Sequence, residues 1–172
     1  MEIFNNLQTK SVNKGTILLR HGEHGNVVFK VLKGCLRSYV IDKSGKEHIL
    51  QFAPEDWLIS DMDGMVNNKP SVIFIDAIED SEVMLLTRST FENIAELDQA
   101  FLVEQNIKLM RNLITANKRL IALMSASSED RYTEFVETYP TLIQRIPLKF
   151  IASYLGMTPE YLSEVRRKLT KK

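Results

Sequence analysis

The first half of the chain alternates between short apolar runs and turn residues. Turns rich in acidic, serine or glycine residues separate the runs, as at Asp42–Gly45 and Glu79–Ser81. Short strands at regular spacing are typical of an antiparallel sandwich or jelly roll. The pattern predicts six strands over Gly15–Leu19, Val27–Leu32, Cys35–Ile41, Glu47–Phe52, Ser71–Ile78 and Glu82–Thr87.

The hydrophobic period then changes from two to 3.6, and residues 96–124 contain no proline or glycine. This predicts a long helix, on which seven positions at alternating spacings of four and three form one stripe. The stripe could pack on the roll, but the helix is too long for one small roll to cover. Asn117 lies within the stripe, where a polar residue typically sets the register of a dimer. We therefore predict a dimer interface of Val103, Ile107, Met110, Ile114, Asn117, Ile121 and Met124.

The remaining chain is predicted to form three short helices. After a serine-rich break, Ser128 is expected to cap a helix over residues 129–138. The next helix is closed by Gly156, because glycine favours the left-handed conformation just past a helix end. Thr158 caps the last helix and Pro159 occupies its first position. Two helices joined by a short glycine-containing turn predict a helix-turn-helix.

Charge divides the chain even though its 172 residues have a formal net charge of zero. Residues 141–172 carry seven basic and two acidic side chains, a net +5 that favours a polyanionic partner at this end. The outer face of the last helix is polar near its start and basic further along, as reading of a DNA groove requires. The alternative is an ordinary amphipathic hairpin with a solvated face. The predicted DNA-binding residues are Lys149, Thr158, Glu160, Tyr161, Ser163, Glu164, Arg166, Arg167 and Lys168.

On the segments Lys14–Ile59 and Arg145–Lys168, the chain resembles the cyclic-AMP receptor protein family of Crp/Fnr-type regulators. The resemblance covers nearly the whole length. It implies an α+β fold with an N-terminal cyclic-nucleotide-binding-like β jelly roll over 1–95, a dimerisation helix over 96–126 and a helix-turn-helix domain over 127–172. By position, Glu160 matches the family's glutamate that accepts from a cytosine amino group, and Lys149 matches a phosphate contact.

The chain also departs from the family's pattern. Pro159 and Glu164 stand where relatives often have arginines, so the DNA target cannot be copied from them. Nucleotide-binding members carry a Gly-Glu pair and an Arg followed by Ser or Thr, but the matching positions here hold other residues, and Lys69 is the nearby cation. We therefore expect an unknown small-molecule effector rather than cyclic AMP. The matching positions, our predicted effector pocket, are Ser60, Asp61, Ser71 and Val72.

Two other functions compete with DNA binding. A cupin-like metal-dependent enzyme would need about three imidazoles and a carboxylate, for which the candidates are His21, Glu23, His24 and His48. The other alternative is a roll that binds a partner protein and no small molecule. We expect no enzyme activity, metal or cofactor, because no nucleophile–base pair or phosphate-binding loop is evident. Since the first residues lack a secretion signal, we expect a cytoplasmic homodimer that binds double-stranded DNA and RNA polymerase, without a membrane.

Overall fold

The computed structural model describes residues 8–170 except residues 88 and 91–98. Its N-terminal part is a roll of two four-stranded sheets, in which all strand pairs are antiparallel. One sheet has the order β1-β8-β3-β6, and the other has the order β2-β7-β4-β5. The strands are β1 (Thr9–Val12), β2 (Ile17–Leu19), β3 (Val27–Lys33), β4 (Leu36–Ile41), β5 (Glu47–Ala53), β6 (Leu58–Ile59), β7 (Phe74–Ala77) and β8 (Ser81–Thr87).

The space between the two sheets is filled by aliphatic side chains. Val31 and Val83 from one sheet meet Leu36 and Ile75 from the other, and all four are fully buried. Burial of this kind stabilises the roll by about 1.5–3 kcal/mol for each large side chain. The fold class expected from the sequence, a jelly roll followed by helices, is therefore confirmed.

Three elements of the roll escaped the sequence prediction. Strand β1 has three exposed residues and a single buried one, so it lacks an alternating apolar pattern. Strand β6 has only two residues, and helix α1 (Met62–Asn67) has six, including Gly64. Segments this short carry too few positions to establish a period.

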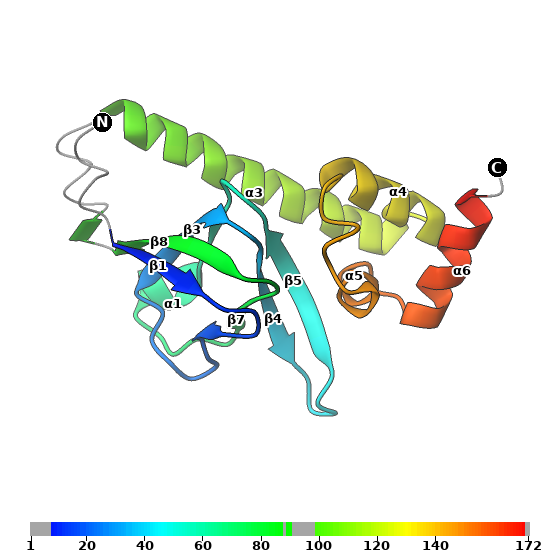
Figure 1. Cartoon of the computed structure of the whole chain (residues 1–172), viewed down its shortest axis with the longest axis horizontal. Coiled ribbons are helices and arrows are strands. Elements are labelled where there is room, and N and C mark those ends of the chain that lie inside the picture. Colours follow the sequence, from blue (N-terminus) through cyan, green and yellow to red (C-terminus); the bar gives the residue numbers. More distant parts are fainter. Residues whose placement is uncertain (1–7, 88, 91–98, 171–172) are drawn as a thin grey trace.

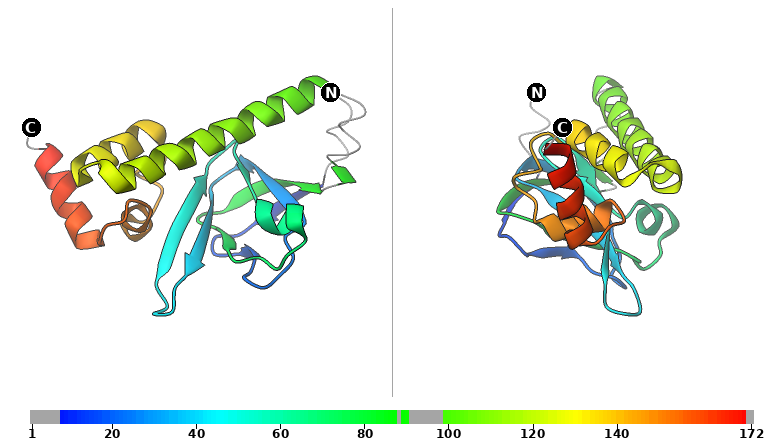
Figure 2. Two further views of the ribbon diagram at one scale, coloured as in Figure 1. Left: turned by 180° about the vertical axis from the view of Figure 1, so that it is seen from behind. Right: turned by 90° about the vertical axis from the view of Figure 1, so that its right-hand side faces the viewer.

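The long helix α3 (Gln99–Ser125) runs over the roll along the length of the molecule, as Figures 1 and 2 show. One face packs on the roll: Gln105 is buried, and the Asn112 side-chain amide donates a hydrogen bond of 3.1 Å to the Leu58 carbonyl. The expected start of this helix at residue 96 lies outside the described residues. Where it is described, the helix agrees with the prediction from period and composition.

Three helices follow α3 at the end of the molecule away from the N-terminal strand: α4 (Ser128–Thr138), α5 (Leu148–Tyr154) and α6 (Pro159–Thr170). Thr158 caps α6 by accepting a hydrogen bond of 3.2 Å from the amide three residues on, as predicted. Gly156 has a φ of +68°, which confirms its left-handed role after α5. The cap of α4 is Ser127 rather than Ser128, because Ser127 is still extended and its hydroxyl accepts from the amide of Asp130.

One hydrophobic cluster joins the roll to these helices. Phe52 of β5 lies 5.2 Å from the Tyr154 ring of α5 and 6.1 Å from the Phe135 ring of α4, measured between ring centroids. Tyr139, after α4, contacts both Phe52 and Trp57 of the roll. Aromatic pairs of this kind contribute about 0.5–1.5 kcal/mol each beyond the area they bury. The helical end therefore packs on the roll through a shared core.

Candidate nucleic-acid interface

Helix α6 buries one face and exposes the other. Leu162 and Val165 are completely or almost completely buried, while Leu169 is partly buried against the same cluster. Figure 2, right, looks onto the end of the molecule where α6 lies across the front. The residues predicted to contact DNA are all exposed: Lys149, Thr158, Glu160, Tyr161, Ser163, Glu164, Arg166, Arg167 and Lys168. The structure thus gathers the whole predicted set on accessible surface.

Two hydroxyls of this set already have partners within the helix. Thr158 Oγ1 accepts the capping hydrogen bond, and Ser163 Oγ donates to the Pro159 carbonyl at 2.9 Å. Ser163 is therefore better placed to accept a hydrogen bond than to donate one. Among the described residues, the charged groups of Glu160 and Arg167 make no hydrogen bond or ion pair. They are available to a ligand that approaches the exposed face.

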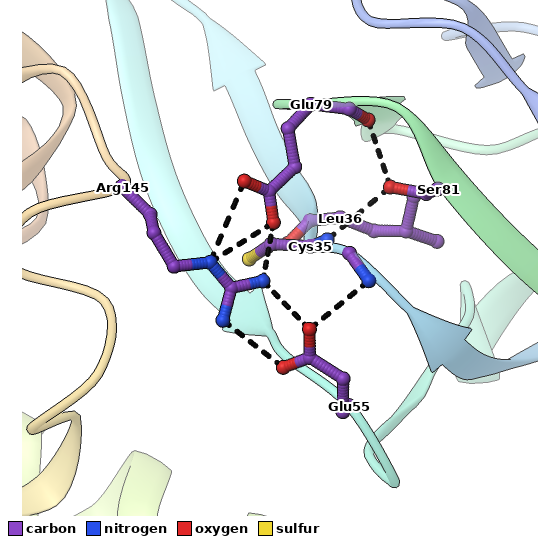
Figure 3. Close-up of polar contacts among 7 residues, drawn as sticks. Cys35, Leu36, Glu55, Glu79, Ser81 and Arg145 are labelled. Carbon is purple, nitrogen blue, oxygen red and sulfur yellow. Dashed lines mark hydrogen bonds and ion pairs between the residues drawn. The ribbon is translucent and has the colours of Figure 1, made fainter.

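Charged contacts fix where this face lies relative to the roll (Figure 3). Arg145, in the loop between α4 and α5, donates to both carboxylate oxygens of Glu55 at 2.7 and 3.1 Å, and pairs with Glu79. Glu55 also accepts from the backbone amide of Gly34 at 3.0 Å. Hydrogen bonds from Arg145 hold the pKa of Glu55 below its usual range, and these carboxylates raise the pKa of Arg145. The cluster ties the helical end to two turns of the roll.

A second set of contacts ties α5 to strands β4 and β5. The Arg37 guanidinium binds both carboxylate oxygens of Asp76, at 2.7 and 2.8 Å, and lies 3.9 Å over the Phe150 ring of α5. Ser153 Oγ accepts from the Ile49 amide at 3.1 Å and donates to the Glu47 carbonyl at 2.9 Å. Sequence reasoning missed these residues, because nothing in their local pattern marks them as partners.

The four predicted effector residues do not converge on one cavity. Asp61 is buried and caps α1 by accepting from the Gly64 amide at 3.1 Å. Ser71 is also buried, and its hydroxyl bonds to the backbone of Ile73. Val72 is 61% exposed. Ser60 lines a cavity of about 260 Å³ between the roll and α3, together with Gln51 and Asn112 among others, and the other three residues are not part of that lining.

Three of the four residues considered for a metal site have separate local partners. His21 stacks on the Phe74 ring, Glu23 accepts from the Arg20 amide, and His48 binds Asp42 at 2.7 Å. Across the described ranges, no three His, Cys, Asp or Glu side chains are grouped so that they could hold a metal ion. The geometry gives the cupin-like alternative no support.

The predicted dimer stripe is exposed along its length, on the face of α3 turned away from the roll. The exposed fractions are 56% for Val103, 48% for Ile107, 54% for Met110, 54% for Ile114, 63% for Ile121 and 81% for Met124, and Asn117 is also exposed. Leu113 and Leu120 extend the apolar surface beside it. The stripe therefore does not pack on the roll, which was the alternative to a partner helix.

Comparisons with known proteins agree with this architecture. Residues 9–98 match the family described as cyclic nucleotide-binding domain. The chain belongs to this family. The regulatory protein HlyX of Actinobacillus pleuropneumoniae is 27% identical over 171 residues, which cover 91% of this chain and 69% of HlyX. The fumarate and nitrate reduction regulatory protein of Vibrio cholerae is 26% identical, over 91% of this chain and 66% of its own length. The chain is a Crp/Fnr-type transcriptional regulator.

A solved structure supports the fold over nearly the whole chain. FixK2 from Bradyrhizobium japonicum superposes with a TM-score of 0.80 at 22% identity, over 96% of this chain and 85% of FixK2. The regulator spans about two thirds of the length of the curated relatives named above. No helix in the described part of the regulator is long and apolar enough to cross a membrane.

Proposed function

We propose that this regulator reads specific DNA sequences with α6 in the major groove, as a two-fold homodimer formed along α3. The observation that carries the proposal is the division of α6: Leu162 and Val165 anchor it, and its opposite face is exposed, polar and basic. Helices that read a major groove contact bases from their first turns and phosphates from their flanks.

Each part of the exposed face has its own role in this proposal. Glu160 and Ser163, in the first turns, meet base edges, and the Glu160 carboxylate accepts from a cytosine amino group. Arg166 and Lys168 flank the helix and contact phosphates. Lys149 of α5 adds another phosphate contact, supported by its exposed position at the start of the motif. Arg167 points into the groove.

The dimer is supported by the exposed apolar face of α3. A second copy would cover the stripe with its own stripe, as a two-fold interface requires. In this arrangement residues 1–95 form a sensor domain, 96–126 the dimerisation helix and 127–172 the DNA-binding domain. The protein acts by binding rather than by catalysis, in the cytoplasm, and its further partner is RNA polymerase.

Cyclic AMP is not the effector in this proposal. Asp61 and Ser71 are engaged in local hydrogen bonds, and the exposed Lys69 is the nearby cation. A cyclic phosphate in a buried cradle needs a cation or several donors. The roll therefore senses another small molecule or none.

Selection of bound sequences from random duplexes tests the proposal directly. The full chain should enrich an inverted repeat whose half-site centres lie about 10 base pairs apart, because a two-fold dimer presents its recognition helices one turn apart. The double variant Glu160→Ala/Ser163→Ala should enrich a more degenerate motif. If the purified dimer shows no preference among duplexes at physiological salt, the α5–α6 unit is better explained as a protein-docking element.

A further inference from the structure

A second cavity lies at the junction between the long helix and the helix-turn-helix. Its volume is about 240 Å³, and the second half of α3, α4 and the end of α5 enclose it. Three aromatic rings, those of Phe135, Tyr139 and Tyr154, line one side. Sites for drug-sized ligands usually measure roughly 300–1,000 Å³. This cavity therefore has room for a compact molecule built around a single ring.

The rest of the lining carries an excess of positive charge. Lys118, Arg119 and Arg131 are opposed by Glu134 alone among the charged residues of the lining. Basic side chains from two helices meet here, although α4 taken alone is acidic in its first turn. A molecule that enters the cavity is therefore selected for negative charge.

Arg119 is a partly buried cation held by neutral groups. Its guanidinium donates to the backbone carbonyls of Tyr154 at 2.8 Å, Ile49 at 2.8 Å and Leu50 at 3.1 Å, and lies 4.1 Å over the Tyr154 ring. It forms no ion pair with any described residue, and burial lowers its pKa. An anion in the cavity would supply the opposite charge that the protein does not.

Arg131 contributes an unsatisfied donor. Its Nη2 donates to Ser128 Oγ at 3.2 Å, but its Nε is buried and has no hydrogen-bond partner within the described chain. A buried donor without a partner is costly, and native proteins rarely retain one without a use. A carboxylate in the cavity would give the Arg131 side chain an anionic acceptor, and hydrogen bonds between a guanidinium and a carboxylate are charge-assisted and strong.

We propose that this hinge cavity binds a small aromatic carboxylate. The ring packs against Phe135, Tyr139 and Tyr154, and the carboxylate accepts from Arg131 beside the positive charge of Arg119. Because the walls come from the dimerisation helix and from the first helix of the motif, an occupant fixes the angle between them. That regulatory consequence, unlike the binding itself, rests on the proposed DNA-binding function.

Calorimetric titration of the full chain without DNA tests the binding. The probes are benzoate, 4-hydroxybenzoate, phenylacetate and indole-3-acetate, and benzamide is the uncharged counterpart of benzoate. At least one carboxylate should bind saturably and raise Tm, and benzamide should not. Absence of saturable binding by all four acids, or equal binding of benzamide, would overturn the proposal.

Two variants in the lining should move the affinity in opposite directions. Arg131→Gln should weaken binding of the best acid roughly tenfold, because a charge-assisted hydrogen bond is removed. Glu134→Gln should tighten it a few-fold, because the opposing carboxylate is removed. Arg20→Gln, an exposed arginine on the roll, serves as the control and should leave the affinity unchanged. Unchanged affinity in both lining variants places the acid elsewhere.

A parallel DNA measurement separates this site from the proposed function. If the acid binds to the parent chain and binds more weakly to Arg131→Gln, the cavity assignment holds. It holds even if the duplex selection shows no sequence preference. If the acid binds and the selection succeeds, occupancy should change the affinity for the selected duplex, and Arg131→Gln should reduce that change.

Discussion

Helices α3 and α6 both leave one face uncovered, but the two faces differ in chemistry. The exposed face of α3 is apolar, with Ile121 63% and Met124 81% exposed. The exposed face of α6 is polar and charged, from Glu160 to Lys168. The buried faces also differ: α6 buries Leu162 and Val165, whereas the side chains of Asn112 and Arg119 on α3 donate hydrogen bonds to backbone carbonyls of the roll. The exposed face therefore distinguishes the partner of each helix.

The difference predicts that the two interfaces respond to salt to different degrees. Burial of apolar surface depends little on ionic strength, whereas contacts to phosphate release counterions and weaken steeply as salt rises. Raising salt should therefore separate the regulator from DNA while the dimer persists. Each helix can be tested by a substitution that reverses the character of its exposed face.

The largest effect is expected from Ile121→Asp, near the C-terminal end of the stripe. A carboxylate would be buried close to its symmetry mate, which costs several kcal/mol unless the dimer separates. Sedimentation should show a monomer, and DNA affinity should fall with it. Val72→Asp is a matched control, because Val72 on the roll is 61% exposed, close to the 63% of Ile121. A variant that stays dimeric would place the interface elsewhere.

Glu160→Ala should relax the preference at one base pair by about 1–3 kcal/mol. Affinity for non-specific DNA should be kept or rise, because a negative charge facing phosphates is removed. Competition between the selected site and singly substituted sites measures the change. Glu137→Ala, an exposed glutamate on α4, should leave the preference intact. Equal losses on every sequence would remove Glu160 from base reading.

Lys149→Ala should weaken binding about equally on all sequences. The slope of log affinity against log salt should fall by roughly one unit for the phosphate that each half-site no longer neutralises. Titrations at several salt concentrations measure this slope. Lys43→Ala, in the turn between β4 and β5, is the control that should preserve it. An unchanged slope in Lys149→Ala would show that this lysine does not bind phosphate.

A smaller effect concerns the ion pair between Arg145 and Glu55, which ties the loop between α4 and α5 to the roll. Arg145 depresses the pKa of Glu55 below its ordinary 4.5, so the contribution of Glu55 to stability is present above that pH. It disappears as pH falls through the depressed pKa. Glu55→Gln should therefore lower Tm near neutral pH and flatten its decline in acid, measured by thermal unfolding. Glu82→Gln, exposed on β8, should behave like the parent chain.

The smallest effect is expected from cyclic AMP. A ligand at 100 times its Kd would add about 2.7 kcal/mol of stability, so binding would be visible as a rise in Tm. We expect no rise at millimolar nucleotide. A clear rise would show that Asp61 and Ser71 exchange their local hydrogen bonds for contacts to the ligand.

The sequence by itself determined the helices that follow the roll and the faces of α3 and α6. The helical spacing of apolar residues decided which residues of α6 are buried. The cap at Thr158 fixed the start of α6, and Gly156 fixed the turn before it. These features depend on neighbours within one or two helical turns, so a linear pattern contains them. The same is true of the α3 stripe, whose heptad spacing was enough to place it on a single face.

Only the tertiary structure decided how the helical end sits on the roll and where its cavities lie. Arg145 meets Glu55 across 90 positions of the chain, and Ser153 meets Glu47 across 106. Arg131 and Arg119 face one cavity only because α4 folds back against α3. Side chains so far apart share no local period, and a charged residue in a loop looks the same whether it is solvated or paired. Their pairing follows from the packing of whole elements, which brings charges that are distant in the sequence into contact.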